Sequence, residues 1–382
     1  MEVVYKAPAP AVVQPARLDP FLSQKLRFWS LVAMLLLVYV HAYNLHSRYL
    51  QPWTPVDEAL SPGTFLQYFL ANGLLRFRIP ILFAISGYLF AHHDAGTPHR
   101  ERVKRRLRTL LVPYLLWSLF GLAFTWALEQ HPYTRQLVLS AALSVFGRDN
   151  PLVSGYSPKE LLLRWLLLPV PFQLWFLRSL LVLNLAYPAL RWVLDRRGAI
   201  VYFIIAALLW LTEFNVLFFD GSGLLFFALG VWLRRRNVEV LLQPHWFRLL
   251  PLALLWLGLV AVKTWMAFHF EHPPFIPMIL LHRAAELLGV VVMWFGSNAV
   301  VRAAMRRSWF VWLTGFSFMI YVLHVPLVNY ATEAVLGVWP QLQLLTFLLL
   351  PLAVVAVAVL LGAALRRLAP GAYGLLTGGR GL

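Results

Sequence analysis

The sequence predicts an all-α polytopic membrane protein with about ten transmembrane helices in one bundle. Of its 382 residues, 60% are hydrophobic and 13% are charged, about half the charged share of a soluble globular domain. Apolar runs of about 20 residues, the length that a helix needs to cross a bilayer, recur along the chain, and Lys and Arg collect between them. A net charge of +17 distributed in this way is typical of positive-inside loops, so we expect no nucleic-acid partner.

Ten candidate spans follow one another along the chain. They cover residues 26–46, 68–91, 109–128, 172–193, 199–217, 218–233, 247–267, 277–298, 309–331 and 342–365. Residues 129–171 contain two apolar pieces that are too short to cross, and we expect an outer excursion or a re-entrant pair there. With ten spans, every Arg-rich loop falls on one side of the membrane, which predicts that both termini are cytoplasmic.

The spans form one predicted domain, residues 25–368. It lies between a short disordered cytoplasmic tail, residues 1–24, and a second cytoplasmic tail, residues 369–382. The first tail is rich in Pro and Ala and has no apolar core, so it does not fit a signal peptide. The chain has no Cys, which excludes a disulfide framework, a thiolate nucleophile and a Cys metal site.

Polar and titratable residues gather in the outer half of these spans. Charged side chains at membrane depth cost roughly 2.5–3.5 kcal/mol each on insertion scales, so they usually face a bundle interior or a watery cavity. We therefore predict a polar chamber in the outer half of the bundle. Its candidate residues, from most of the spans, are His41, Arg76, Arg78, Gln173, Arg178, Glu213, Asp220, Lys263, His269, His282, Arg283, Glu286, His324 and Asn329.

Each of these residues also has a purely structural interpretation. Arg76 and Arg78 could snorkel to the outer interface. His282 and Glu286 lie four residues apart on one helix face and could satisfy each other, while His324 could be a hydrogen-bonded packing histidine. The shared level of the residues, more than any one of them, favours a functional site.

The basic runs at residues 99–108 and 234–236 are explained first as topology signals. A cytoplasmic donor that carries phosphates would also dock on such loops, because guanidinium groups bind phosphate through two parallel hydrogen bonds. The sequence has no Walker loop, no GxGxxG motif after a strand, no GxSxG elbow and no HExxH. Nucleotide hydrolysis and zinc or serine hydrolase chemistry therefore have no support.

Five stretches carry a family resemblance. They are FRIPILFAISGYLF at 77–90, KRRLRTLLVPYLLWSL at 104–119, QLWFLRSLLVLNLAYPAL at 173–190, LLFFALGVWL at 224–233 and SFMIYVLHVPL at 317–327. In this order they resemble the membrane-bound acyltransferase family 3, the bacterial O- and N-acyltransferases that modify surface polysaccharides and periplasmic glycans. The resemblance spans nearly the whole chain and includes the count of ten helices.

In that family the first helix carries an Arg, ten intervening residues and then a His that is regarded as essential. His41 matches the His, and the Arg position falls on Ser30. Eleven residues return to within roughly 20° of the same helix face and span about 16 Å. Arg27 lies about 40° off that face, one turn nearer the cytoplasm, and could take a similar role. Relatives often have a His where this chain has Gln173.

The resemblance implies an integral protein of the bacterial inner membrane that moves an acyl group, with acetyl expected, from cytoplasmic acyl-CoA to a hydroxyl or amine of a cell-envelope glycan or glycolipid. A histidine, with a pKa near 6.5, suits the base for such a step, and we assign that role to His41. Arg76 or Arg78 could stabilise the oxyanion. The second-tier catalytic candidates are His324 and Glu286, and the candidates for binding acyl-CoA are Arg27, Arg105 and Arg106.

Acyl-CoA, the acceptor and membrane lipid are the expected partners, and no tightly bound cofactor or metal is expected. The alternative function is a transporter or flippase for polysaccharide or lipid-linked glycan, which would also have a polar chamber. Such proteins often show inverted repeats with broken helices, and no repeat is evident in the sequence. A different membrane acyltransferase fold would also use an intramembrane His, but without the ISGY and WFL elements in this order.

Overall fold

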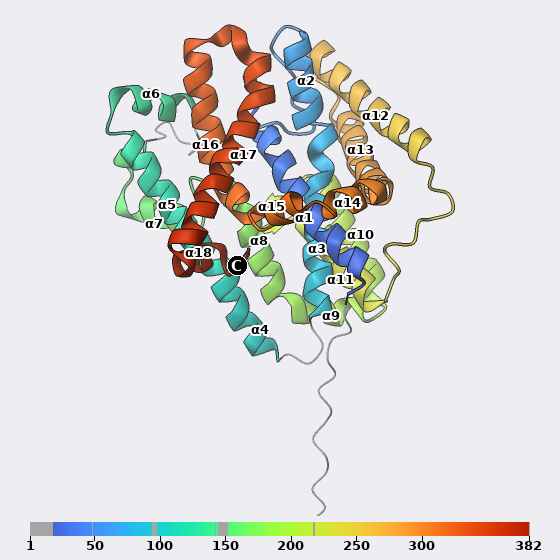
Figure 1. Ribbon diagram of the computed structural model, residues 1–382. Coiled ribbons are helices and arrows are strands. Elements are labelled where there is room, and N and C mark those ends of the chain that lie inside the picture. The colour runs from blue at the N-terminus through green and yellow to red at the C-terminus, as the bar shows by residue number, and fades with distance from the viewer. Residues whose placement is uncertain are drawn as a thin grey trace, which may run out of the picture.

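The all-α class is confirmed by the computed structural model, which describes residues 18–47, 49–93, 98–141, 143, 152–216 and 218–381 (Figure 1). Strand structure in these residues is limited to a short antiparallel pair, β1 (Asn215–Val216) and β2 (Phe219–Asp220). Residues 1–17 of the tail predicted for 1–24, and residues 142 and 144–151 of the predicted excursion, lie outside the described residues.

The helices of the first half are α1 (Pro20–His41), α2 (Pro62–Ala71), η1 (Leu74–Phe77), α3 (Arg78–His92), α4 (His99–Arg106), η2 (Leu107–Leu111), α5 (Val112–Leu128), α6 (Pro132–Ala141), η3 (Val153–Gly155), α7 (Pro158–Leu166), η4 (Phe172–Leu174) and α8 (Trp175–Leu185). Those of the second half are α9 (Tyr187–Leu194), α10 (Gly198–Leu211), η5 (Gly223–Phe227), α11 (Ala228–Arg235), α12 (Leu249–His269), α13 (Phe275–Gly296), α14 (Asn298–Met305), α15 (Ser308–Thr314), α16 (Ser317–Val338), η6 (Pro340–Leu342), α17 (Gln343–Leu368) and α18 (Pro370–Thr377).

Seven helical stretches among the described residues are long and apolar enough to cross a membrane. The predicted spans 172–193, 199–217 and 218–233 form shorter helices, so the count of ten stays a prediction. One cause is Pro188 in the first turn of α9, because a proline has no N–H to bond the carbonyl oxygen four residues earlier and its ring clashes with that carbonyl group, which separates α9 from α8. Of the seven stretches, α16 and α1 are the least hydrophobic, and the one containing α17 is the most hydrophobic.

The second predicted span is broken between α2 and α3. The break lies at Gly73, where a Cβ atom would come within 2.6 Å of the Phe69 carbonyl oxygen. A break inside a membrane needs internal partners for its carbonyl groups. Lys263 Nζ donates to the backbone carbonyl oxygen of Asn72 at 2.6 Å, and Arg76 Nε donates to that of Ala71 at 2.9 Å. Two of the predicted chamber cations therefore stabilise the break.

α1 runs through the bundle and packs against α3, α16 and α17 (Figure 1). α3 also crosses α11 at very short range, because a Cβ on Gly87 would lie 2.0 Å from the Phe227 oxygen and a Cβ on Gly230 would lie 2.0 Å from the Ala84 oxygen. Small residues allow helices in membranes to approach this closely. The crossing fixes α3 against its neighbours.

The ends of the predicted domain differ from the sequence-based boundaries. The segment predicted as a tail, 369–382, forms α18, which packs against α5 and α17. Tyr373 and Thr377 are fully buried, and Trp117 Nε1 donates to the Leu376 oxygen at 2.9 Å. At the other end, α1 already begins at Pro20, capped by the Asp19 carboxylate, which accepts from Leu22 N at 2.8 Å.

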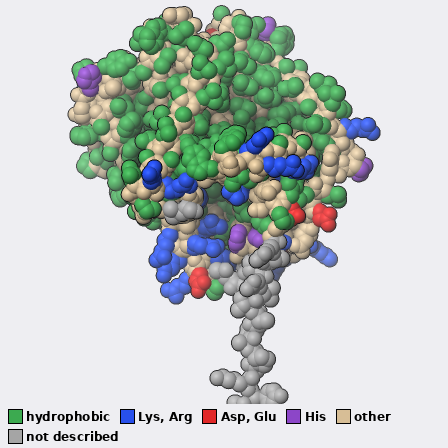
Figure 2. Space-filling model, viewed as in Figure 1, with side chains coloured by type: hydrophobic (Ala, Val, Ile, Leu, Met, Phe, Trp, Pro, Cys, Tyr) green, Lys and Arg blue, Asp and Glu red, His purple; other side chains and the backbone are tan. Residues whose placement is uncertain are grey.

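Positive charge gathers at one end of the bundle. On the face shown in Figure 2, Lys and Arg side chains cluster over the lower half, whereas hydrophobic side chains cover most of the upper half. Four arginines are connected through their contacts: Arg27 donates to Thr314, Arg366 donates to the Gly381 oxygen, and Arg380 donates to the Thr109 oxygen while its charge acts on Arg106. We call this the basic end; His41 is at the other end of α1.

Candidate active site

His41 and His324 lie side by side. Their ring centroids are 5.4 Å apart, and the Phe172 ring stands edge-on to His41 at 5.1 Å. His41 is half-buried, and its ring makes no hydrogen bond to any residue that the structure describes. His324 is fully buried. The structure thus brings together two predicted catalytic residues from distant parts of the sequence.

The position of His41 is set by the chain that follows it. α1 ends at His41, and the residues that follow have no regular secondary structure. Gln67 Oε1 accepts from the backbone N–H of Asn44 at 2.7 Å, and Gln343 Nε2 donates to the backbone carbonyl oxygen of Asn44 at 2.8 Å. These side chains, from α2 and α17, hold the exit of α1 and so fix the height of His41.

The orientation of His324 is set by its own helix. Its Nδ1 lies 2.7 Å from the Tyr321 carbonyl oxygen, so we assign the ring hydrogen to Nδ1 and leave Nε2 as the acceptor nitrogen. Nε2 is buried without a hydrogen-bond partner in the described chain. A buried acceptor left in this state is available to a hydrogen on a bound ligand.

Gln173 joins η4 to α16 beside His324. Pro326 has no N–H, so the Val322 carbonyl oxygen loses its helical partner. Gln173 Nε2 donates to this oxygen at 3.0 Å, and the Tyr321 hydroxyl donates to the backbone carbonyl oxygen of Gln173 at 2.7 Å. Gln173 therefore completes the hydrogen bonding of a proline-interrupted helix at the site.

Arg78 is the arginine most closely associated with the two histidines. It begins α3, is 2% exposed, and donates through Nη1 to the Leu75 oxygen at 2.8 Å. Its charge acts on both His41 and His324, whereas its Nε is buried and unpaired among the described residues. It lies inside the bundle and does not snorkel.

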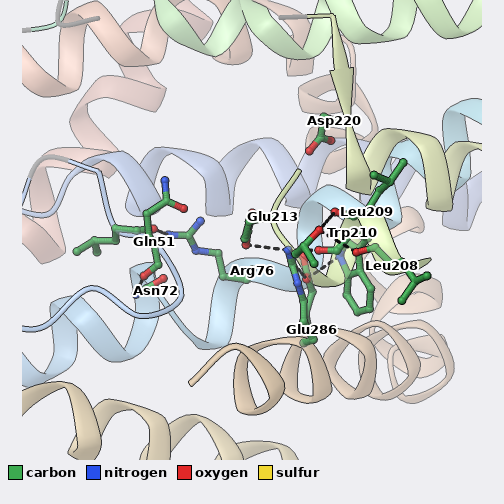
Figure 3. Close-up of polar contacts among 12 residues, drawn as sticks. Gln51, Asn72, Arg76, Leu208, Leu209, Trp210, Glu213, Asp220 and Glu286 are labelled. Atoms are coloured by element: carbon green, nitrogen blue, oxygen red, sulfur yellow. Dashed lines mark hydrogen bonds and ion pairs between the residues drawn. The ribbon is translucent and has the colours of Figure 1, made fainter. Parts of the chain in front are cut away.

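Arg76 points elsewhere. Its side chain extends toward Gln51 and Asn72 (Figure 3) and donates to the Ala71 and Leu50 oxygens, at 2.9 and 2.8 Å. Its charge also acts on His41, but more weakly than that of Arg78. Arg76 therefore has a structural task at the helix break, and the oxyanion role of either arginine stays a prediction.

Glu286 belongs to a separate ion-pair cluster. Its Oε2 accepts from Arg283 Nη1 at 2.8 Å and from Trp210 Nε1 at 3.2 Å, and Arg283 also pairs with Glu213 at 2.8 Å (Figure 3). The alternative pair of His282 with Glu286 is not the one formed. Glu286 makes no contact with either histidine of the site in the described residues, and its catalytic role stays a prediction.

A cavity of about 520 Å³ lies between the histidine pair and the basic end. α1, α3, α8 and α16 line it, and its residues include Ser30, Ser86, Phe176 and Tyr321. The candidate site residues lie on or next to the same four helices, one or more turns farther from the basic end. His41 ends α1, Arg78 begins α3, Gln173 lies in η4 two residues before α8, and His324 is one turn beyond Tyr321. The cavity therefore leads from the basic end toward the histidines.

The predicted acyl-CoA ligands divide between the cavity and its surroundings. Arg27 lines the cavity and donates through Nη2 to Thr314 Oγ1 at 3.1 Å. Arg105 is exposed on α4, and Arg106 lies 5.0 Å from the centre of the Phe90 ring; neither lines the cavity. Arg380 lines it as well.

Comparison with known proteins identifies the family. Residues 28–366 match the family model described as an acyltransferase domain. The chain belongs to acyltransferase family 3. This acyltransferase is 25% identical over 353 residues to the succinoglycan biosynthesis protein ExoH of Rhizobium meliloti (strain 1021), a match that covers 88% of each chain. No solved structure gave a significant match.

Sequence reasoning missed two features of the acyltransferase site. One is the bond from Gln173 to Val322, which Pro326 signals because a proline inside a helix frees the carbonyl four residues earlier. The other is Arg380, which lies in a segment predicted to be a tail. Its signal is the run Gly378-Gly379-Arg380-Gly381, a turn-forming composition around one cation.

Proposed function

We propose that this enzyme moves an acyl group, with acetyl expected, from acyl-CoA to a hydroxyl or amine of a cell-envelope glycan. One observation carries the proposal: the four helices that line the cavity from the basic end also bring His41, Arg78 and His324 together beyond it. The donor would enter at the basic end, on the cytoplasmic face, and the acceptor would reach His41 from the other side. The succinoglycan biosynthesis protein among its relatives supports a glycan acceptor.

His41 is the base in the proposed step. It takes the proton of the acceptor hydroxyl while the acceptor oxygen forms a bond to the thioester carbon. The tetrahedral intermediate then collapses, the C–S bond breaks, and the proton on His41 passes to the departing CoA sulfur. The products are the acyl ester and CoA thiol, and His41 is regenerated.

His41 suits this role better than His324. Its half-buried ring is free of hydrogen bonds within the described chain and stands at the end of its helix. His324 is fully buried, and its Nδ1 is engaged with the Tyr321 oxygen. We therefore assign His324 to accept a hydrogen from the substrate through Nε2 and so to position it.

Arg78 supplies positive charge for the oxyanion. A buried guanidinium that is already fixed beside the reacting carbonyl stabilises developing negative charge without reorganisation. Its hydrogen bond to the Leu75 oxygen fixes one side of the guanidinium. Its unpaired Nε provides a donor that the folded chain has not used.

The proposed function is tested by replacing His41. We expect His41→Ala to lower acyl transfer from labelled acetyl-CoA by about 10²- to 10⁴-fold, the usual contribution of general base catalysis. His272→Ala, at an exposed histidine on the loop after α12, is the matched control and should keep wild-type activity. Equal folding of both variants is checked by thermal unfolding in detergent.

Two results would contradict the proposal. Full activity of His41→Ala would remove His41 as the base. Absence of acetyl-CoA turnover by the wild-type protein, with every acceptor glycan fraction tried, would instead favour the transporter alternative.

A further inference from the structure

The segment after α18 forms a tight turn against the cavity. Gly378, Gly379 and Gly381 all have positive φ angles, of 62°, 79° and 78°, a region that glycine enters without steric penalty. A Cβ on Gly378 would lie 2.5 Å from the Thr109 oxygen, and a Cβ on Gly381 would lie 2.1 Å from the Gly315 oxygen. The three glycines thus let the backbone approach two other segments closely.

Several hydrogen bonds hold this turn in place. Arg366 Nη1 donates to the Gly381 oxygen at 3.0 Å, and the Tyr373 hydroxyl donates to the Gly315 oxygen at 3.2 Å. The turn is therefore tied to α17, and the helix before it, α18, is tied to the loop between α15 and α16. It forms a fixed wall of the cavity.

The turn directs one cation into the cavity wall. Arg380 donates through Nη1 to the Thr109 and Thr377 oxygens, at 2.8 and 2.9 Å, and its guanidinium lies 4.8 Å from the centre of the Phe318 ring. Its Nε and Nη2 make no hydrogen bond to residues within the described ranges. Burial lowers the pKa of Arg380 to about 10, so the guanidinium is still charged at neutral pH.

The chemistry of this end of the cavity is that of an anion site. Arg380 and Arg27 both line it, together with the hydroxyl groups of Ser23, Thr314 and Ser317. No carboxylate belongs to the lining in the described chain. Most of the other lining side chains, toward Tyr321, are Leu, Met and Phe, with Ser30 and Ser86 among them. A ligand that fits has phosphate at one end and a long, weakly polar arm at the other.

We propose that Arg380, together with Arg27, forms a phosphate site at the basic end of the cavity and that it binds the phosphates of the acyl-CoA donor. This deepens the proposed function and rests on it. The unused Nε and Nη2 atoms of Arg380 give a guanidinium edge that can meet two phosphate oxygens at once. The acyl-bearing arm of the donor then lies along the apolar part of the cavity toward His41.

The first test measures binding of CoA, which cannot react, to the full-length protein in detergent. Arg380→Gln should weaken CoA binding about ten- to a hundredfold, because a charge-assisted pair to phosphate is lost. Arg380→Lys should lie between this variant and the wild type. Arg367→Gln removes the same charge from an exposed position on α17 and should bind CoA as the wild type does.

A second pair of variants moves Arg380 without removing it. Gly381→Ala places a methyl group against the Gly315 oxygen and should displace the turn, so CoA binding should fall as in Arg380→Gln. Gly371→Ala adds a methyl group to α18 where nothing lies within 4 Å of the new Cβ, and CoA binding should be unchanged. Agreement between Arg380→Gln and Gly381→Ala would support the turn as the device that positions the cation.

The outcomes separate the phosphate site from the proposed function. If the wild type binds CoA and Arg380→Gln binds it equally well, the role of Arg380 is overturned while acyl transfer stands. If the wild type does not bind CoA at all, the donor proposal itself fails. If Arg380→Gln loses stabilisation by phosphatidylglycerol but keeps its affinity for CoA, the phosphate belongs to a lipid headgroup and this inference is wrong.

Discussion

The contribution of Gln173 to stability at the position of Pro326 can be measured. The proline frees the Val322 oxygen, and the glutamine side chain supplies the missing donor from a different helix. A buried acceptor that loses its partner costs about 1–3 kcal/mol. The pair therefore contributes to the stability of α16 close to His324, which lies two residues before the proline.

We expect Gln173→Ala to lower the free energy of unfolding by about 1–3 kcal/mol and to reduce acyl transfer. In a Pro326→Ala background the new N–H can bond the Val322 oxygen inside the helix, so the same glutamine change should cost well under half as much. Unfolding of the four proteins of this double-mutant cycle gives the coupling. Equal costs in both backgrounds would refute the partnership.

Arg76 and Arg78 offer a comparison of a partly buried and a buried cation from neighbouring positions. Arg78→Gln should lower kcat by about 10²- to 10³-fold, the range found for loss of an oxyanion donor, with the KM for acetyl-CoA little changed. Arg76→Gln should act mainly on stability, because it leaves the Ala71 and Leu50 oxygens without their donor. Steady-state kinetics and unfolding of both variants check this division. Loss of kcat only in Arg76→Gln would reverse the assignment.

The crossing of α3 and α11 depends on two glycines that face the opposite backbone. An added methyl group at either position would overlap a carbonyl oxygen of the other helix, and overpacking of this kind costs about 1–3 kcal/mol. Because α3 starts with Arg78, a shift of this helix also moves the cation at the site. Helix packing and catalysis are coupled here.

We expect Gly87→Ala and Gly230→Ala each to lower thermal stability in detergent and to reduce acyl transfer. Gly258→Ala, in α12, meets nothing within 4 Å and should be neutral or slightly stabilising, since alanine is favoured over glycine inside a helix. Thermal unfolding of the three variants decides this. A neutral Gly87→Ala would show that the crossing can relax.

The long apolar helices could be predicted from the sequence because hydrophobic length alone determines whether a segment can cross a bilayer. The points at which these helices are interrupted could not be predicted from the sequence. The break at Gly73 depends on Lys263 and Arg76 reaching its carbonyl oxygens, and this is a tertiary arrangement. Segments 172–193 and 218–233 were predicted as single spans although each divides into shorter helices in the structure.

The predicted topology of the whole chain rests on the charge pattern and can be tested simply. The chain has no native Cys, so Arg100→Cys and His272→Cys each create a unique, exposed label site. With the predicted orientation, a membrane-impermeant maleimide added to intact cells should label position 272 and not position 100. Permeabilised cells should label both. Labelling of position 100 in intact cells would invert the predicted orientation and separate the basic end from the cytoplasm.

The depth of each candidate site residue along its span could be predicted from the sequence. The residues that it bonds or pairs with could not. The shared level correctly grouped His41 with His324, because residues at the same depth on packed helices come within reach. It also grouped Glu286 with them, although a rotation around the helix axis directs that carboxylate to Arg283 and Trp210. The position of Arg380 could not be predicted in this way, because no hydrophobic pattern indicates that a turn folds back onto a cavity.

The two helices that carry the histidines, α1 and α16, are the least hydrophobic of the seven long stretches, and the neighbour of α16, α17, is the most hydrophobic. Partitioning of a helix from the translocation machinery into lipid follows its apolar content. We therefore expect the polar groups of α16 to weaken its entry into the bilayer, and we expect its packing against α17 to offset that loss if the two helices insert together. Assembly of the candidate site would then depend on a helix that contributes no proposed catalytic group to it.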